Sequence, residues 1–247
     1  MGGDKPLSYF PIKEANPFLG WRGVRITLDH PEIFITQVRA MLRANIGRGN
    51  LQILLPMISG RKELEESLTI MRRAKDEIEE DFDQVISMPP IGAMIEVPSA
   101  VYQIEDICSV VDFVSVGTND LTQYLLAVDR NNENVADLFS SLHPAVLKAL
   151  KQIAVGASYS NTPVSVCGEL AGDPLGVMAL LGIGIDSLSM STGSILKAKK
   201  VIKSFTMTEM KSMFDVAVKM SDSSDVRRMY SERLDERGLG GLIRAGK

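Results

Sequence analysis

Short apolar runs alternate with longer amphipathic segments along this chain, and this alternation constrains the fold more than any other feature. The runs at residues 51–58, 91–97, 111–117, 164–168 and 187–191 each predict a buried strand. A short sixth strand is expected around residues 24–27. Strands that alternate with helices imply right-handed crossovers and a parallel sheet.

The segments between the runs have helical spacing. Residues 61–80 show the clearest case, because apolar side chains recur there at intervals of three, four and seven: Leu64, Leu68, Met71 and Ile78. Other helices are expected to begin at prolines that follow capping or turn residues: Pro31, Pro98, Pro144 and Pro174. Beyond residue 204, Met210, Met213 and Phe214 predict a further helix.

Polar residues at the predicted strand ends favour a barrel over an open doubly wound sheet. Barrel enzymes build their sites at the carboxyl ends of the strands. Polar residues lie at or just beyond the ends of three predicted strands here: Glu96 after one, Asn119 and Asp120 after the next, and Cys167 and Glu169 after a third. No G-x-G-x-x-G follows a strand, so a dinucleotide site has no support. We therefore expect an α/β fold of the (β/α)8 TIM barrel type.

A complete barrel needs eight strands, and the sequence supplies fewer. We expect an N-terminally truncated barrel that lacks about its first two strands. Residues 1–205 would form this partial barrel, and residues 206–247 would form C-terminal helices and a flexible tail.

Composition excludes several classes of protein. The 247 residues carry a net charge of −4, so no overall positive field exists to bind nucleic acid. Two cysteines and the lack of a leader pattern predict a cytoplasmic protein. No apolar run approaches the length of a membrane span, so no membrane partner is expected.

Glu96 and Asp120 are the candidate metal ligands. Two carboxylates at neighbouring strand ends, with no histidine beside them, suit a hard ion that completes its shell with water and substrate. The pattern predicts Mg²⁺ rather than zinc. Taken singly, Glu96 could be a salt-bridged rim residue and Asp120 a helix-start residue.

Arg22 and Arg130 are candidate cations for an anionic substrate, because a guanidinium presents a planar fork to phosphate or carboxylate oxygens. Asn119 adds a neutral amide donor. The alternatives stay open: each arginine could be a surface residue, Arg25 could replace Arg22, and Asn119 could cap a turn.

Cys167 could act as a proton donor at the barrel mouth, because a thiol with an ordinary pKa of about 8.5 remains mostly protonated at neutral pH. Its alternative role is that of a small buried apolar residue. His30 and His143 each precede a proline at a helix start, so we interpret both as structural rather than as partners of Cys167.

Several strings of residues resemble a known family. They occur at 2–5 (GGDK), 16–22 (NPFLGWR), 55–57 (LPM), 96–98 (EVP), 116–124 (VGTNDLTQY), 129–130 (DR) and 167–173 (CGELAGD). Their order is similar to that in the phosphoenolpyruvate-binding barrel of enzyme I, the phosphoenolpyruvate-protein phosphotransferase of the bacterial phosphotransferase system. Pyruvate phosphate dikinase and phosphoenolpyruvate synthase share this barrel but match less closely.

The resemblance implies a role for each candidate residue. Mg²⁺ would bind Glu96 and Asp120, and Cys167 would be the acid at C3 of the substrate. The substrate-binding set implied for phosphoenolpyruvate is Lys5, Arg22, Asn119, Asp120 and Arg130. The strings at 96–99 (EVPS), 129–132 (DRNN) and 141–144 (SLHP) resemble the nitrogen-regulatory branch of the family.

The same resemblance implies partners that this chain does not contain. The phosphoryl group would pass to a histidine on another domain and then to a small phosphocarrier protein, with release of pyruvate. We therefore expect a homodimeric fragment of a longer enzyme, inactive alone. The alternative is a noncatalytic module that serves dimerisation or ligand sensing. A Mg²⁺-dependent aldolase or lyase is less favoured, because such an enzyme needs a base to deprotonate its substrate and no residue of the sequence is an obvious candidate.

Overall fold

The strands form one parallel sheet. The computed structural model describes residues 2–3, 8 and 10–244. Its sheet contains β1 (Ile53–Leu55), β2 (Ile91–Ile95), β3 (Phe113–Gly117), β4 (Val164–Cys167) and β5 (Ser187–Leu188), hydrogen-bonded in that order. All four neighbouring pairs are parallel. The five strands expected from the apolar runs are thus confirmed.

The strand order explains why the fold belongs to the barrel class. In a doubly wound sheet the order reverses part-way, whereas here each strand pairs with the next one in sequence. Every crossover therefore advances in the same direction, as it does around a TIM barrel. The described residues form five consecutive strands of such an arrangement, an α/β fold with a parallel, TIM-barrel-like sheet.

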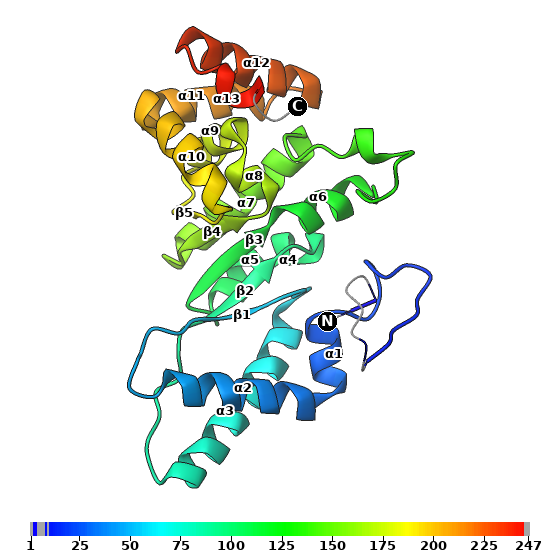
Figure 1. The fold of residues 1–247 in the computed structure, drawn as a ribbon, viewed down its shortest axis with the longest axis vertical. Coiled ribbons are helices and arrows are strands. Elements are labelled where there is room, and N and C mark those ends of the chain that lie inside the picture. The colour runs from blue at the N-terminus through cyan, green and yellow to red at the C-terminus, as the bar shows by residue number, and fades with distance from the viewer. Residues whose placement is uncertain (1, 4–7, 9, 245–247) are drawn as a thin grey trace.

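Helices connect the strands and extend beyond both ends of the sheet (Figure 1). The helices before β2 are α1 (Val24–Asp29), α2 (Pro31–Asn45) and α3 (Arg61–Phe82). Between β2 and β5 lie α4 (Pro98–Tyr102), α5 (Ile104–Cys108), α6 (Thr118–Leu126), η1 (Ala136–Leu138), α7 (Pro144–Tyr159), α8 (Glu169–Gly172) and α9 (Pro174–Ile183). After β5 come α10 (Thr192–Ser204), α11 (Met207–Ala217), α12 (Ser223–Glu236) and α13 (Gly241–Arg244).

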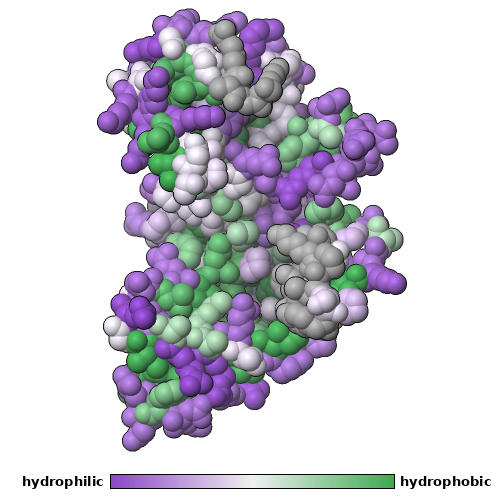
Figure 2. All heavy atoms as spheres, viewed as in Figure 1, coloured by the Kyte–Doolittle hydropathy of each residue, from purple (hydrophilic) through white to green (hydrophobic). Residues whose placement is uncertain are grey.

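The two faces of the sheet differ in polarity. Alternate residues such as Ala93, Val116 and Val166 are fully buried in the main apolar core. The opposite face of β3, β4 and β5 carries paired serines instead, with Ser165 opposite both Ser115 and Ser187. Figure 2 shows apolar residues gathered across the middle of the molecule, between more hydrophilic ends.

Two predicted elements were wrong. Residues 24–27 belong to helix α1, because Val24 and Ile26 are buried on one side of a short helix that packs against α2 and α3. Four alternating residues are too few to distinguish a strand from a helical turn. The single helix expected after Pro98 is two helices, α4 and α5, which meet at Gln103.

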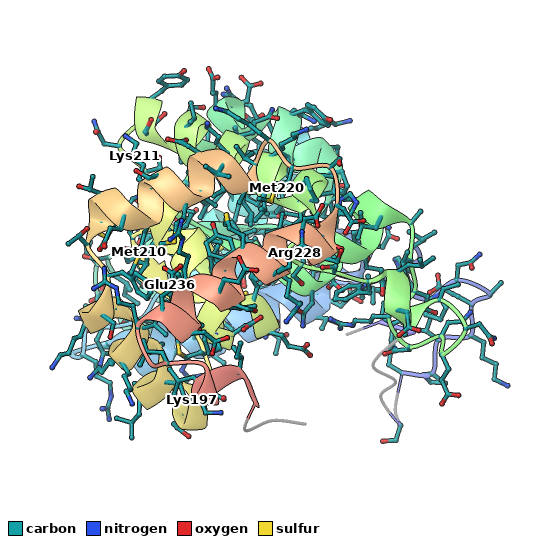
Figure 3. All side chains as sticks on the ribbon, turned by 90° about the horizontal axis from the view of Figure 1, so that it is seen from above. Lys197, Met210, Lys211, Met220, Arg228 and Glu236 are labelled. Atoms are coloured by element: carbon teal, nitrogen blue, oxygen red, sulfur yellow. The ribbon has the colours of Figure 1, made fainter. Side chains whose placement is uncertain are left out.

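The C-terminal helices pack on the barrel helix α9. Gly182 of α9 lies so close to α11 that an added Cβ would sit 2.5 Å from the carbonyl oxygen of Met210. Figure 3 looks onto this end of the molecule and shows α11 and α12 lying across it. Met210 of α11 is buried, whereas Lys211 of α11 and Arg228 of α12 are exposed. The boundary at residue 205 and the flexible tail stay predictions.

No helix in the described part of the chain combines the length and the apolar character that crossing a membrane requires.

Candidate functional site

Glu96 and Asp120 approach each other across the carboxyl ends of neighbouring strands. Glu96 follows β2 directly, and Asp120 lies in the first turn of α6, which follows β3. Gly117, the last residue of β3, makes room for Glu96. A Cβ added at Gly117 would lie 2.6 Å from Glu96 Oε2, so any other residue here would displace the Glu96 carboxylate from this position.

Asp120 lies between two arginines. Its Oδ2 accepts a hydrogen bond from Arg22 Nη2 at 3.1 Å, and its Oδ1 lies 4.0 Å from Arg130 Nη2. Asp120 Oδ1 is buried and has no hydrogen-bond partner among the described residues. Because a buried carboxylate oxygen without a partner is costly, this atom is a natural ligand for a cation.

Glu96 is only 4% exposed and is held by the backbone of a neighbouring loop. Its Oε1 accepts a hydrogen bond from the amide of Met57 at 2.8 Å. Burial raises the pKa of Glu96 from its ordinary 4.5 to about 7, and the nearby charge of Asp120 acts in the same direction. The backbone of Met57 adopts a left-handed conformation, with φ at 61°, at this contact.

Arg22 is also held by two aromatic residues. Its Nη1 donates a hydrogen bond to Tyr124 Oη at 3.0 Å, and its guanidinium lies 5.7 Å from the centre of the Phe18 ring. Tyr124 Oη in turn donates to the carbonyl of Phe18. The loop before α1 and helix α6 together therefore hold this arginine.

Cys167 and Asn119 lie next to this cluster: Cys167 is the last residue of β4, and Asn119 lies in the first turn of α6. Cys167 Sγ donates a hydrogen bond to the carbonyl of Val116 at 3.4 Å, and burial raises the pKa of its thiol. Asn119 Oδ1 accepts a hydrogen bond from the amide of Glu169 at 3.2 Å. Both side chains line a cavity of about 560 Å³. The thiol thus keeps its proton at neutral pH and borders a space that a ligand could enter.

The structure brings most of the predicted site residues together. Arg22, Glu96, Asp120 and Arg130 form one cluster, with Asn119 and Cys167 beside it. Lys5 lies outside the described residues. No group of three or more His, Cys, Asp or Glu side chains poised for a metal occurs in the described ranges. Two carboxylates still suit Mg²⁺, which keeps several waters and substrate oxygens as ligands.

The histidines have structural contacts. His143 Nδ1 accepts a hydrogen bond from the amide of Ala145 and so caps α7. His30 packs its ring against Trp21 and Phe10 and pairs with Glu32. Both contacts agree with the structural interpretation.

Sequence reasoning missed Met57 and Tyr124. Tyr124 lies four residues after Asp120, a spacing that places both side chains on the same face of a helix and could have indicated its contact with Arg22. For Met57, no sequence signal predicts that a backbone amide will bind Glu96.

Comparison with known proteins assigns this chain to a family. Residues 1–207 match the family described as PEP-utilising enzyme, PEP-binding domain, where PEP is phosphoenolpyruvate. The chain is 48% identical over 246 residues to "Phosphoenolpyruvate-dependent phosphotransferase system" of Escherichia coli K12. It is 41% identical over 243 residues to "Phosphoenolpyruvate-protein phosphotransferase" of Haemophilus influenzae.

These matches cover nearly all of this chain but only part of each relative: 33% of the E. coli protein and 42% of the H. influenzae protein. Among solved structures, a citrate lyase from Burkholderia xenovorans has a similar fold. Its TM-score is 0.52 at 14% identity, over 87% of this chain and 74% of that one. The family match and the two relatives together show that this chain belongs to the PEP-binding domain family of PEP-utilising enzymes.

Proposed function

We propose that this chain is the substrate-binding part of a Mg²⁺-dependent phosphoenolpyruvate-protein phosphotransferase. In this reaction the phosphoryl group of phosphoenolpyruvate passes to a histidine outside this chain and then to a small phosphocarrier protein, and pyruvate is released. The observation that carries the proposal is the cluster of Arg22, Glu96, Asp120 and Arg130 at the carboxyl ends of parallel strands. The family match supports it.

The arginines provide the substrate contacts in this proposal. Arg22 and Arg130 approach Asp120 from two directions, so their guanidinium groups can bind phosphate and carboxylate oxygens of one small anion. Tyr124 and Phe18 hold Arg22 before the substrate arrives. Asn119 adds an amide, and Lys5 remains a candidate from the sequence.

Glu96 and Asp120 would hold Mg²⁺. The buried Oδ1 of Asp120, which has no hydrogen-bond partner in the described part of the chain, fits a hard cation. When bound, this ion supplies positive charge that stabilises the developing enolate. Because Glu96 binds a proton up to about pH 7, loading of the site must release that proton.

Cys167 would supply the proton that converts the enolate to pyruvate. Breaking the phosphorus–oxygen bond leaves an electron pair on the enolate oxygen as the phosphoryl group leaves. The enolate then takes a proton at C3 from the Cys167 thiol, which burial keeps protonated, and the resulting thiolate recovers a proton from water. Charge on the enolate is the state that Arg22 and Arg130 are placed to stabilise.

We further propose the nitrogen-regulatory branch as the subfamily. The strings at 96–99, 129–132 and 141–144, which resemble that branch, support this assignment. A homodimer and a cytoplasmic location also stay predictions.

Reconstitution tests the activity. This chain would be mixed with the remaining part of the E. coli relative, made as a separate polypeptide, together with phosphoenolpyruvate, Mg²⁺ and the phosphocarrier protein. We expect pyruvate release that is lost with Cys167→Ala and kept with Cys108→Ala as the matched control. Absence of pyruvate while the two polypeptides associate would favour the noncatalytic module.

A further inference from the structure

A second cavity lies beside the site and shares none of its charged residues. It has a volume of about 520 Å³ and lies between the loop at 15–19, the start of α4 and the second half of α6. Its wall is mainly apolar and includes Phe18, Leu19, Val97, Pro98, Tyr124 and Val128. In Figure 1 these elements are the blue loop before α1 and the green helix α6. A cavity of this size and polarity is typical of a small-molecule site.

Two opposite charges also line this cavity. Arg25 donates through Nη1 to the carbonyls of Leu19 and Gly20, at 3.0 and 2.9 Å, and has no carboxylate within ion-pair distance among the described residues. Asp129 accepts a hydrogen bond from the amide of Asn131 at 2.9 Å, and no cation of the described ranges pairs with it. Arg25 and Asp129 are not paired with each other, which leaves each charge able to bind a ligand.

We infer that this cavity binds a zwitterionic α-amino acid with a large apolar side chain. Arg25 binds the carboxylate, Asp129 binds the ammonium group, and the side chain lies against the rings of Phe18 and Tyr124. A simple anion would meet the charge of Asp129, and a simple cation would meet that of Arg25. A zwitterion is the small ligand that satisfies both.

This site is distinct from the proposed function but adjoins it. Two of its wall residues, Met57 and Tyr124, also hold Glu96 and Arg22. The inference does not depend on catalysis, because binding to the cavity requires neither Mg²⁺ nor phosphoenolpyruvate. The test is therefore made in the absence of both, so its failure leaves the proposed function untouched.

Calorimetric titration with three related probes measures the binding. The probes are L-phenylalanine, phenylpropionate, which lacks the ammonium group, and phenethylamine, which lacks the carboxylate. We expect L-phenylalanine to bind. Each analogue should bind with an affinity at least about tenfold lower, because each loses one charged contact. Trp21, the single tryptophan, follows the loop that lines the cavity and gives a second readout by fluorescence.

Two variants distinguish ionic recognition from general apolar binding. Asp129→Asn keeps the oxygen that accepts from Asn131 but removes the negative charge. It should therefore weaken L-phenylalanine about tenfold and strengthen phenylpropionate, because the anion no longer meets a like charge. Val97→Phe should fill the cavity and abolish binding of all three probes. Val155→Phe, an exposed position on α7 outside the cavity, is the matched control and should bind like the unaltered chain.

The inference is overturned if L-phenylalanine does not bind, or if phenylpropionate or phenethylamine binds as tightly as L-phenylalanine. Binding of L-phenylalanine that persists in Val97→Phe or is unaffected by Asp129→Asn would also contradict it.

Discussion

At the scale of the residue, Glu96 shows how burial determines chemistry. Its carboxylate is held by the amide of Met57 and lies beside Asp120, in space that Gly117 leaves open. Burial favours the protonated form, which raises its pKa to about 7. The group is therefore poised between a protonated form without metal and an ionised form that could bind a cation.

The raised pKa predicts how stability depends on pH. Below the ordinary value of 4.5, Glu96 is protonated in both the folded and unfolded states. As pH rises toward 7 the unfolded chain releases this proton while the folded protein retains it, so the free energy of unfolding falls. Above about pH 7 the loss is complete.

Glu96→Gln cannot ionise, so we expect it to avoid this loss. The free energy of unfolding would be measured by urea denaturation without metal. As pH rises from 5 to 8, the free energy of unfolding of the variant should increase relative to that of the unaltered chain, by up to about 3 kcal/mol. Glu133→Gln, at an exposed position, is the control and should change the pH dependence little. Parallel pH profiles for Glu96→Gln and the unaltered chain would refute the burial argument.

At the scale of the element, the close contact between α9 and α11 attaches the C-terminal helices to a helix of the barrel. Gly182 permits this approach because it has no Cβ, and Phe214 of α11 is buried at the same place. The neighbouring helix α10 contains a comparable glycine, Gly193, which has open space around its Cβ position. The two glycines therefore offer a matched pair of substitutions.

We expect Gly182→Ala to lower the free energy of unfolding by about 1–3 kcal/mol, because the new methyl group would collide with the backbone of Met210. Gly193→Ala should be neutral or stabilising by up to about 1 kcal/mol, since alanine favours helix. Thermal and urea denaturation measure both. Equal effects of the two substitutions would mean that the α9–α11 contact is not tight.

At the scale of the whole molecule, the sequence pattern predicted the sheet and much of the site. Apolar runs identified all five strands because β1 to β4 are largely buried, and buried strands have few polar residues. Residues 24–27 were misassigned because apolar residues alternate over only four positions, which also fits a short helix. The buried side of that helix is set by its contacts with α2 and α3, which the local sequence does not reveal. Met57 could not be predicted, since its contact with Glu96 uses a backbone amide and joins two different loops.

The central claim is that Glu96, Asp120, Arg22 and Arg130 form one site for Mg²⁺ and phosphoenolpyruvate. Its most direct test is calorimetric titration of this chain with phosphoenolpyruvate, with and without Mg²⁺. We expect Mg²⁺ to strengthen the binding of phosphoenolpyruvate and Asp120→Asn to remove that effect. Arg130→Ala should weaken phosphoenolpyruvate binding about tenfold. The control Asp137→Asn, on η1, should change neither the affinity nor its dependence on Mg²⁺. Mg²⁺-dependent binding that is unchanged in Asp120→Asn and Arg130→Ala would contradict the assigned site.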